Sequence, residues 1–213
     1  MKDFRQTIAI EKLIVIIRPV SLEQGQAHFQ ALVKAGVKLI EIASNKPFSK
    51  KLLSWARLEA PEICLGAATI FNQDQIRFSK EVGLNFTASP IARPDLIDCA
   101  SSLDIPLVAG VTTANEIAQT LEHPHVDHLK LFPAPDRRTF ASLKKIFPRV
   151  NFILSSFEVS SLPDYLISGN EYFMIGTFLD IGEPSLSERL ELIRSMLQTP
   201  YSSPRKLNIS KLI

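Results

Sequence analysis

Short runs of apolar, often branched residues recur along this chain at spacings of roughly 20 to 25 residues, and a segment with helical periodicity follows each run. This alternation is typical of βα units around a parallel sheet. The expected strands lie at residues 13–17, 38–43, 63–67, 85–87, 106–109, 127–132, 151–155 and 172–175. The expected helices lie within residues 21–35, 48–60, 72–82, 93–102, 115–123, 137–147, 161–167 and 184–197. One more helix is expected ahead of the first strand.

Eight strands that alternate with eight helices favour a fold of the α/β class, a (β/α)8 TIM barrel with an N-terminal helix. A doubly wound open sheet of the flavodoxin type is the structural alternative, although it normally needs fewer strands. No linker or low-complexity segment interrupts the sequence before residue 198. We therefore expect a single barrel domain over residues 1–197 and a C-terminal extension over residues 198–213.

Local signals agree with these helix boundaries. Residues that can cap a helix N-terminus stand at Ser21, Asn72 and Asn115. Gln75 follows Asn72 within the first turn of its helix. Glycines that can end a helix in a left-handed conformation stand at Gly36, Gly83 and Gly169.

The charge balance argues against a polyanionic partner. The chain has 24 Lys and Arg against 22 Asp and Glu, a formal net charge of +2, so we expect no nucleic-acid and no membrane partner. Cys64 and Cys99 stand in apolar stretches without metal or redox spacing, which is typical of reduced thiols in a cytosolic protein. No run approaches the ~20 apolar residues of a membrane span, and no signal-peptide cleavage site follows the N-terminal apolar stretch. We expect a cytoplasmic protein.

The sixth predicted strand alternates two leucines, Leu129 and Leu131, with three residues of other kinds: His128, Lys130 and Phe132. If the leucines pack outward against helices, the other three point into the barrel, where catalytic groups of this fold gather at the carboxyl ends of the strands. Burial disfavours an ammonium ion, so Lys130 should have a lowered pKa, and a neutral amine can attack a carbonyl group. A lysine that only pairs with a buried carboxylate is the alternative.

The second predicted strand holds an acid in the inward phase. Leu39, Glu41 and Ala43 alternate there with two isoleucines, which places Glu41 near the catalytic end of the barrel. A buried carboxyl group beside an amine can donate and accept protons in turn, as imine formation requires. A carboxylate that merely neutralises Lys130 is the alternative. Both interpretations place the two residues in one cavity.

Three more residues stand at the carboxyl ends of predicted strands. Arg18 follows the first strand in the inward phase, and its guanidinium group is a natural fork for a substrate carboxylate. A surface salt bridge is the alternative for this residue. Thr69 and Pro90 end the third and fourth strands, where each could serve the site or only the fold.

A group of histidines is weighed as a metal site and set aside. His123, His125 and His128 stand close to Asp127, and imidazole and carboxylate at short spacing can share one ion. However, Pro124 makes the segment a turn, and the strand points His128 away from the other two. We expect no metal.

Six segments carry a resemblance to a known family: LIVIIRPVS, AGVKLIEI, LGAATIFNQDQ, FTASP, IPLVAGVTT and LKLFPA. In this order and at these intervals, they resemble the class I aldolases that act on 2-keto-3-deoxy-6-phosphogluconate (KDPG) and 4-hydroxy-2-oxoglutarate (KHG). The resemblance covers about residues 10–180. The most specific segment is Lys130 to Ala134, because it contains the position of the family's Schiff-base lysine.

The resemblance implies a role for each candidate residue. Lys130 would form an imine with the keto carbon, and Glu41 would act as general acid and base. Arg18 would bind the carboxylate of a small-molecule keto acid, and Thr69 would hydrogen-bond the bound acid. Pro90 and Phe132 would shape its pocket. The imine is the electron sink, so the resemblance implies no cofactor, and it implies a homotrimer, the common assembly of the family.

The loops after the last two strands depart from the family. The family usually has a Thr-Gly-Gly turn after the seventh strand, which offers backbone N–H groups to a phosphate. Here the turn is Ser155, Ser156, Phe157 and Glu158, while Gly176 and Thr177 keep part of the second phosphate-binding turn. We assign Ser155, Ser156, Gly176 and Thr177 to substrate binding.

Three explanations of this altered turn stay open. The substrate could lack a phosphate, other groups such as Arg137 or Arg138 could hold one, or the barrel could have lost catalysis and kept binding. A solvated helix start is the alternative for the two arginines.

The sequence as a whole predicts a metal-independent aldolase that cleaves a 4-hydroxy-2-oxo acid to pyruvate and an aldehyde. Retention of Lys130, Glu41, Arg18 and Thr69 together favours working imine chemistry. The alternative is a catalytically inactive, aldolase-like barrel that acts as a ligand-binding or assembly protein. Another phosphate-dependent barrel enzyme is a weaker alternative, because it too needs a phosphate-binding turn.

Overall fold

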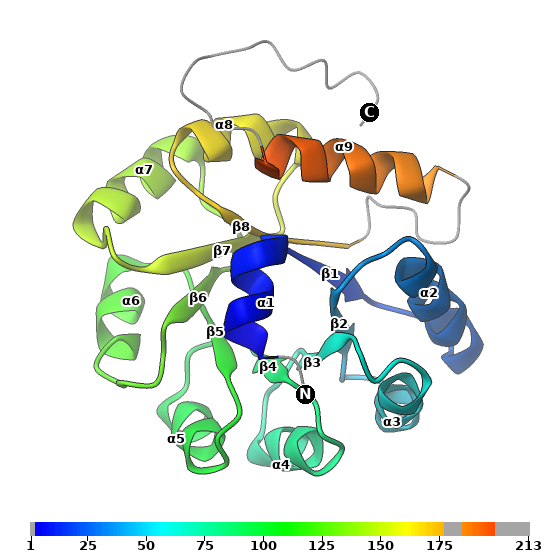
Figure 1. The fold of residues 1–213 in the computed structure, drawn as a ribbon. Helices are drawn as coiled ribbons and strands as arrows, with labels where there is room; N and C mark the ends of the chain where they lie inside the picture. The colour runs from blue at the N-terminus through cyan, green and yellow to red at the C-terminus, as the bar shows by residue number, and fades with distance from the viewer. Residues whose placement is uncertain (1–2, 177–184, 199–213) are drawn as a thin grey trace.

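The computed structural model of the chain describes residues 3–176 and 185–198. Within these residues, parallel strands pair in chain order, and β1 pairs with β8 to close a barrel (Figure 1). The strands are β1 (Leu13–Ile17), β2 (Leu39–Ala43), β3 (Cys64–Ala68), β4 (Phe86–Ala88), β5 (Leu107–Val111), β6 (His128–Leu131), β7 (Asn151–Ser155) and β8 (Tyr172–Ile175). The predicted (β/α)8 barrel is confirmed, and the open-sheet alternative is wrong because the sheet closes on itself.

Helices surround the barrel, and one further helix precedes the first strand (Figure 1). They are α1 (Phe4–Glu11), α2 (Leu22–Lys34), α3 (Ser49–Glu59), α4 (Gln73–Glu81), α5 (Pro94–Ser102), α6 (Ala114–Thr120), α7 (Arg137–Ile146), α8 (Leu162–Ile167) and α9 (Leu186–Gln198), with a 3₁₀ turn, η1 (Val159–Ser161), ahead of α8. No described helix is long and apolar enough to cross a membrane. Of the predicted extension over residues 198–213, the structure describes only Gln198. The division into domain and extension therefore stays a prediction.

Most of the predicted helix ends are confirmed. Ser21 and Asn72 cap α2 and α4 through their side chains. The backbone has positive φ at Gly36, Gly83 and Gly169. The predicted cap at Asn115 is wrong, because α6 begins earlier, at a capping box in which the Thr113 hydroxyl accepts from the Glu116 N–H and the Glu116 carboxylate accepts from the Thr113 N–H.

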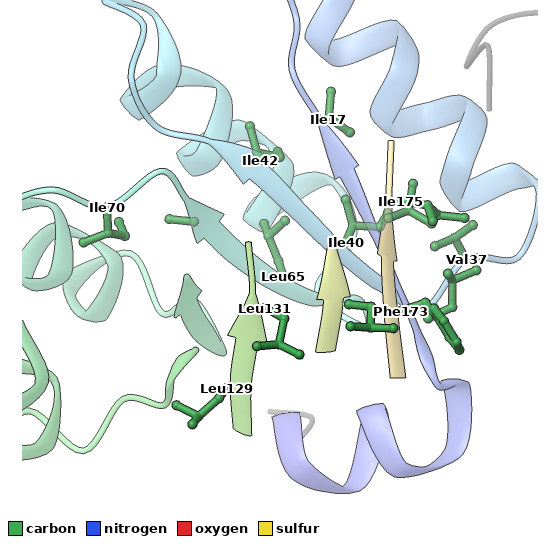
Figure 2. Packing of buried hydrophobic residues seen from close by; sticks show 14 of the residues in the cluster. Ile17, Val37, Ile40, Ile42, Leu65, Ile70, Leu129, Leu131, Phe173 and Ile175 are labelled. Carbon is green, nitrogen blue, oxygen red and sulfur yellow. The ribbon is translucent and has the colours of Figure 1, made fainter. Parts of the chain in front are cut away.

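The core has an outer and an inner layer. The two-residue period of the strands divides their side chains: in β1, Val15 and Ile17 join the outer layer, against the helices, and Ile14 and Ile16 join the inner layer. Figure 2 shows part of the outer layer. Leu129 and Leu131 belong to this outer layer, as predicted. The residues that alternate with them therefore point into the barrel.

Helix α1 closes the amino-terminal end of the barrel (Figure 1). Phe4 and Ile8 belong to the inner layer, and the Phe4 ring stacks on Phe86 with centroids 4.5 Å apart. The His128 ring meets Phe4 and Tyr172 edge-on at 5.6 and 5.7 Å. Aromatic rings thus fill this end of the interior.

The His128 imidazole has a carboxylate partner. Its Nδ1 lies 2.9 Å from the Asp127 carboxylate, which also accepts a hydrogen bond from the Arg5 guanidinium group. His123, from the same predicted cluster, lies 3.4 Å from Asp98. In the part of the chain that the structure describes, no three His, Cys, Asp or Glu side chains are arranged to hold a metal ion.

Gly66 makes room for the aromatic ring at the centre of this packing. It is paired with Glu41 on one side and with Phe86 on the other. A Cβ atom at Gly66 would lie closer than 3.0 Å to three atoms of the Phe86 ring. A side chain at this position and a phenylalanine at position 86 therefore compete for the same space.

We expect Gly66→Ala to lower the free energy of unfolding by about 1–3 kcal/mol, the usual cost of overpacking a core. Urea titration followed by far-UV circular dichroism measures the change. Phe86→Leu in the same chain should recover part of the loss, because the shorter side chain leaves room for the new methyl group. Strict additivity of the two substitutions would contradict this account.

Candidate active site

Two ionisable side chains point into the barrel from strands on opposite sides of it, β2 and β6. Glu41, on β2, is paired with Ile16 of β1 and Gly66 of β3. Lys130, on β6, is paired with Gly110 of β5 and Ile153 of β7. Glu41 is 0% exposed and Lys130 is 3% exposed. The alternation of outward and inward residues along β2 and β6 puts both side chains in the interior, as predicted.

The Glu41 carboxyl group has no hydrogen-bond partner within the described part of the chain, and both of its oxygens are buried. Burial raises its pKa, while the positive charges of Lys130 and Arg18 act in the opposite direction. Buried polar groups are normally satisfied, so an unpartnered buried carboxyl group is a candidate for a functional role.

The Lys130 amine is held as a poor base. Burial lowers its pKa, the Glu41 carboxylate raises it, and the Arg18 guanidinium group lowers it further. The Nζ atom lies over the Phe132 ring, 5.5 Å from the centroid. Because neither Glu41 oxygen accepts a hydrogen bond, Lys130 and Glu41 interact through their charges alone. The charge of Glu41 still acts on Lys130, so a carboxylate that merely neutralises the lysine stays the alternative for this pair.

Arg18 and Thr69 meet at the carboxyl ends of β1 and β3. Arg18 is exposed, and its Nη1 donates to the Thr69 hydroxyl at 3.4 Å. It forms no ion pair with any described residue, so the surface salt bridge considered for it is not seen. Thr69 has a φ of 63°, a left-handed conformation that is rare for a β-branched residue.

Phe132 borders the lysine, and Pro90 lies against the neighbouring strand at Gly110. Both are half-buried, and they follow β4 and β6. A Cβ atom at Gly110, the neighbour of Lys130 in the sheet, would lie closer than 3.0 Å to the backbone of Ser89 and Pro90. A glycine at position 110 therefore lets the Pro90 loop approach the strand pair that holds the lysine.

Ser155, Ser156 and Gly176, from the turns after β7 and β8, lie at the carboxyl ends of these strands. Ser155 is buried, and Ser156 is exposed with a φ of 61°, in the region that favours glycine. Gly176 is half-buried, and a Cβ atom there would lie 2.7 Å from Ile16 Cγ2. Thr177 lies outside the described residues.

Phe157 follows Ser156 in the turn after β7, but its side chain points away from the barrel interior. Its ring packs against Tyr165 and Phe173, with both centroid distances at 5.6 Å, and it contacts the outer layer of the core. The turn leaves the strand period at Ser156, so the next side chain is directed to the outside of the barrel. Glu158 is exposed.

The paired arginines at the start of α7 are exposed, and Arg137 lies 3.7 Å from the Asp164 carboxylate. This surface contact agrees with the solvated helix start.

Gln75, in contrast, makes more contacts than sequence analysis indicated. Its side chain bonds backbone groups after both β2 and β3, and only its place in the Asn72 capping box was visible in the sequence.

Comparison with known proteins identifies the family. The model of the KDPG and KHG aldolases matches residues 5–190. The chain belongs to this aldolase family. The similarity implied by the six sequence segments is thereby confirmed.

Relatives within the aldolase family are distant. The KHG/KDPG aldolase of Escherichia coli is 27% identical over 142 residues, which cover 65% of this chain and 65% of that enzyme. The 2-dehydro-3-deoxy-phosphogluconate aldolase of Pseudomonas aeruginosa is 27% identical over 170 residues, covering 75% of this chain and 77% of the relative. The chain thus spans somewhat less than two thirds of the Escherichia coli protein in that match.

Solved structures share the fold. KDPG aldolase of Zymomonas mobilis with 3-phosphoglycerate has a TM-score of 0.79 at 22% identity, and the match covers 93% of this chain and 96% of that one. KDPG aldolase of Legionella pneumophila, with pyruvate captured as a covalent carbinolamine intermediate, has a TM-score of 0.75 at 22% identity, covering 91% and 95%.

Replacing Lys130 by methionine should change how stability depends on pH. Between the lowered pKa of Lys130 and the ordinary lysine value of 10.5, the unfolded chain binds more protons than the folded one, so the free energy of unfolding rises with pH in the wild type. Lys130→Met lacks this contribution. The difference in unfolding free energy, wild type minus variant, should rise from pH 8 to pH 10 in urea titrations. A pH-independent difference would show that the amine is not perturbed.

Proposed function

We propose that the protein is a class I aldolase that cleaves a 4-hydroxy-2-oxo acid to pyruvate and an aldehyde. The observation that carries this proposal is the buried Lys130 amine facing the same interior as the unpartnered Glu41 carboxyl group. A lowered pKa increases the neutral, nucleophilic fraction of an amine, and a raised pKa increases the protonated fraction of a carboxyl group, which can then give a proton as well as take one. Membership of the aldolase family supports the same chemistry.

The proposed reaction begins at the keto carbon. The neutral Lys130 Nζ attacks this carbon to form a carbinolamine, and the protonated Glu41 carboxyl group gives a proton to the hydroxyl, which leaves as water. The resulting iminium ion is the electron sink. The Glu41 carboxylate then takes the proton of the C4 hydroxyl, the C3–C4 bond breaks, and its electron pair moves into the iminium to give an enamine and an aldehyde.

The second half of the reaction regenerates the enzyme. The enamine takes a proton at C3, and Glu41 is the group that supplies it. Water adds to the iminium carbon and gives a proton to the Glu41 carboxylate. Collapse of this second carbinolamine moves its hydroxyl proton to the nitrogen and releases pyruvate and the free Lys130 amine. One carboxyl group thus both gives and takes protons in the cycle, which requires its pKa to lie near the working pH.

The proposed substrate contacts follow the ends of the strands. Arg18 and Thr69 bind the carboxylate of the keto acid, because the guanidinium group and the hydroxyl already lie together there. Pro90 and Phe132 enclose the reacting carbon. We assign the distal end of the substrate to the turns with Ser155, Ser156, Gly176 and Thr177.

The cellular setting is part of the same proposal. A cytoplasmic location rests on the sequence, in which Cys64 and Cys99 stand in apolar stretches without metal or redox spacing. The homotrimer rests on resemblance to the family.

Incubation with pyruvate and sodium borohydride should trap the imine. We expect intact-mass spectrometry to show one reduced pyruvate adduct on the wild type and none on Lys130→Met, a variant of similar length without an amine. Glu41→Gln should slow adduct formation by about 10²-fold or more, the usual worth of a general acid–base group. A folded wild type without an adduct would favour the alternative, a barrel that binds but does not catalyse.

A further inference from the structure

Gln75 joins the carboxyl ends of two barrel strands through one side chain. It lies in the first turn of α4, and its amide reaches the residue after β2 and the turn after β3. The Oε1 atom accepts from the N–H groups of Phe71 and Asn72 at 2.8 and 3.2 Å. The Nε2 atom donates to the Thr69 carbonyl at 3.3 Å and to the Ser44 hydroxyl at 2.9 Å.

The surroundings determine which way this amide points. Phe71 and Asn72 offer only backbone N–H donors to the oxygen side. The Ser44 hydroxyl donates its hydrogen to the Ala68 carbonyl at 2.6 Å, so it can only accept from Gln75. The NH₂ group must therefore face Ser44 and Thr69, and the two ends of the amide have separate tasks.

The two tasks act on different parts of the structure. The oxygen completes the capping box of α4, which concerns the stability of that helix. The NH₂ group holds the carbonyl of Thr69, whose φ of 63° a threonine adopts only when its surroundings impose it. This backbone conformation places the Thr69 hydroxyl beside the Arg18 guanidinium group.

Ser44 does not depend on Gln75 in the same way. Both its N–H and its hydroxyl bond the Ala68 carbonyl, at 2.8 and 2.6 Å. The end of β2, which carries Glu41, is therefore held to β3 by other bonds. Loss of the Gln75 donor removes one hydrogen bond from the Ser44 carbonyl and one from the Thr69 carbonyl, but Ser44 keeps its two bonds to Ala68.

We propose that Gln75 is a positioning residue that holds Thr69, and through it the Arg18 guanidinium group, in the arrangement that receives the carboxylate of the keto acid. This inference rests on the proposed function, because it assigns that carboxylate to Arg18 and Thr69. Gln75 touches neither Lys130 nor Glu41 in the hydrogen bonds of the described residues, so it should govern binding of the acid and leave the covalent step unchanged.

Gln75→Glu separates the two tasks of the side chain. Glutamate keeps the shape and the oxygen that caps α4, since it is a standard residue at this position of a capping box, but it places an oxygen against the Thr69 carbonyl. The rate of borohydride-trapped adduct formation is measured against pyruvate concentration. We expect the half-saturating pyruvate concentration to rise about tenfold, with the limiting rate within about twofold of the wild type.

Lower pH gives a second readout. A protonated carboxyl group can donate to the Thr69 carbonyl, so the defect of Gln75→Glu relative to the wild type should shrink as the pH falls. Gln75→Asn keeps an amide but is one methylene shorter, and we expect the same rise in half-saturating pyruvate, now without recovery at low pH.

Asn72→Ala is the matched control. It removes the other half of the capping box, which should lower the Tm by a few degrees, and it leaves the Gln75 donor in place. Half-saturation should stay at the wild-type value.

The outcomes are distinct. An unchanged half-saturation in Gln75→Glu, or an equal rise in Asn72→Ala, overturns the positioning role while the aldolase proposal stands. A wild type that forms no adduct overturns the proposed function and this inference with it.

Discussion

Burial of two ionisable groups in one barrel is the constraint on which the rest of the structure depends. Glu41 and Lys130 lie in an interior that disfavours both charges, and each charge partly offsets the cost of the other. Helix α1 and the aromatic rings close the interior at the amino-terminal end of the barrel. The remaining approach to the pair is the carboxyl end of the strands, where Arg18, Thr69 and Pro90 lie. Stability and reactivity are therefore set by the same packing.

Three glycines let neighbouring segments of the barrel pack closely. Gly66 leaves space for the Phe86 ring, Gly110 lets the Pro90 backbone approach β5, and Gly176 clears Ile16. In each case a single Cβ atom would collide with a neighbouring strand or loop. The shape of the interior around Lys130 thus depends on where glycines stand as much as on where large side chains stand.

Much of this arrangement could be predicted from sequence because it depends on the two-residue alternation of side chains along each strand. The strand alternation places Lys130 and Glu41 inward without knowledge of any contact. The two-residue period of a strand no longer predicts side-chain direction beyond the end of the strand. Phe157 points outward because the backbone leaves the strand conformation at Ser156. Tertiary hydrogen bonds such as that from Gln75 to Ser44 carry no local signal, since nothing in either segment reveals its partner.

The pairing of β1 with β8 has a consequence for how the chain is made. Strand β1 can pair on one of its two edges only with β8. This pairing cannot form until almost the whole barrel has been synthesised. Until then β1 presents an unpaired edge of five apolar residues, which is a template for wrong partners. A ribosome that pauses late on this message would prolong that exposure, so the sheet's closure, which protects the finished protein, makes the nascent one vulnerable.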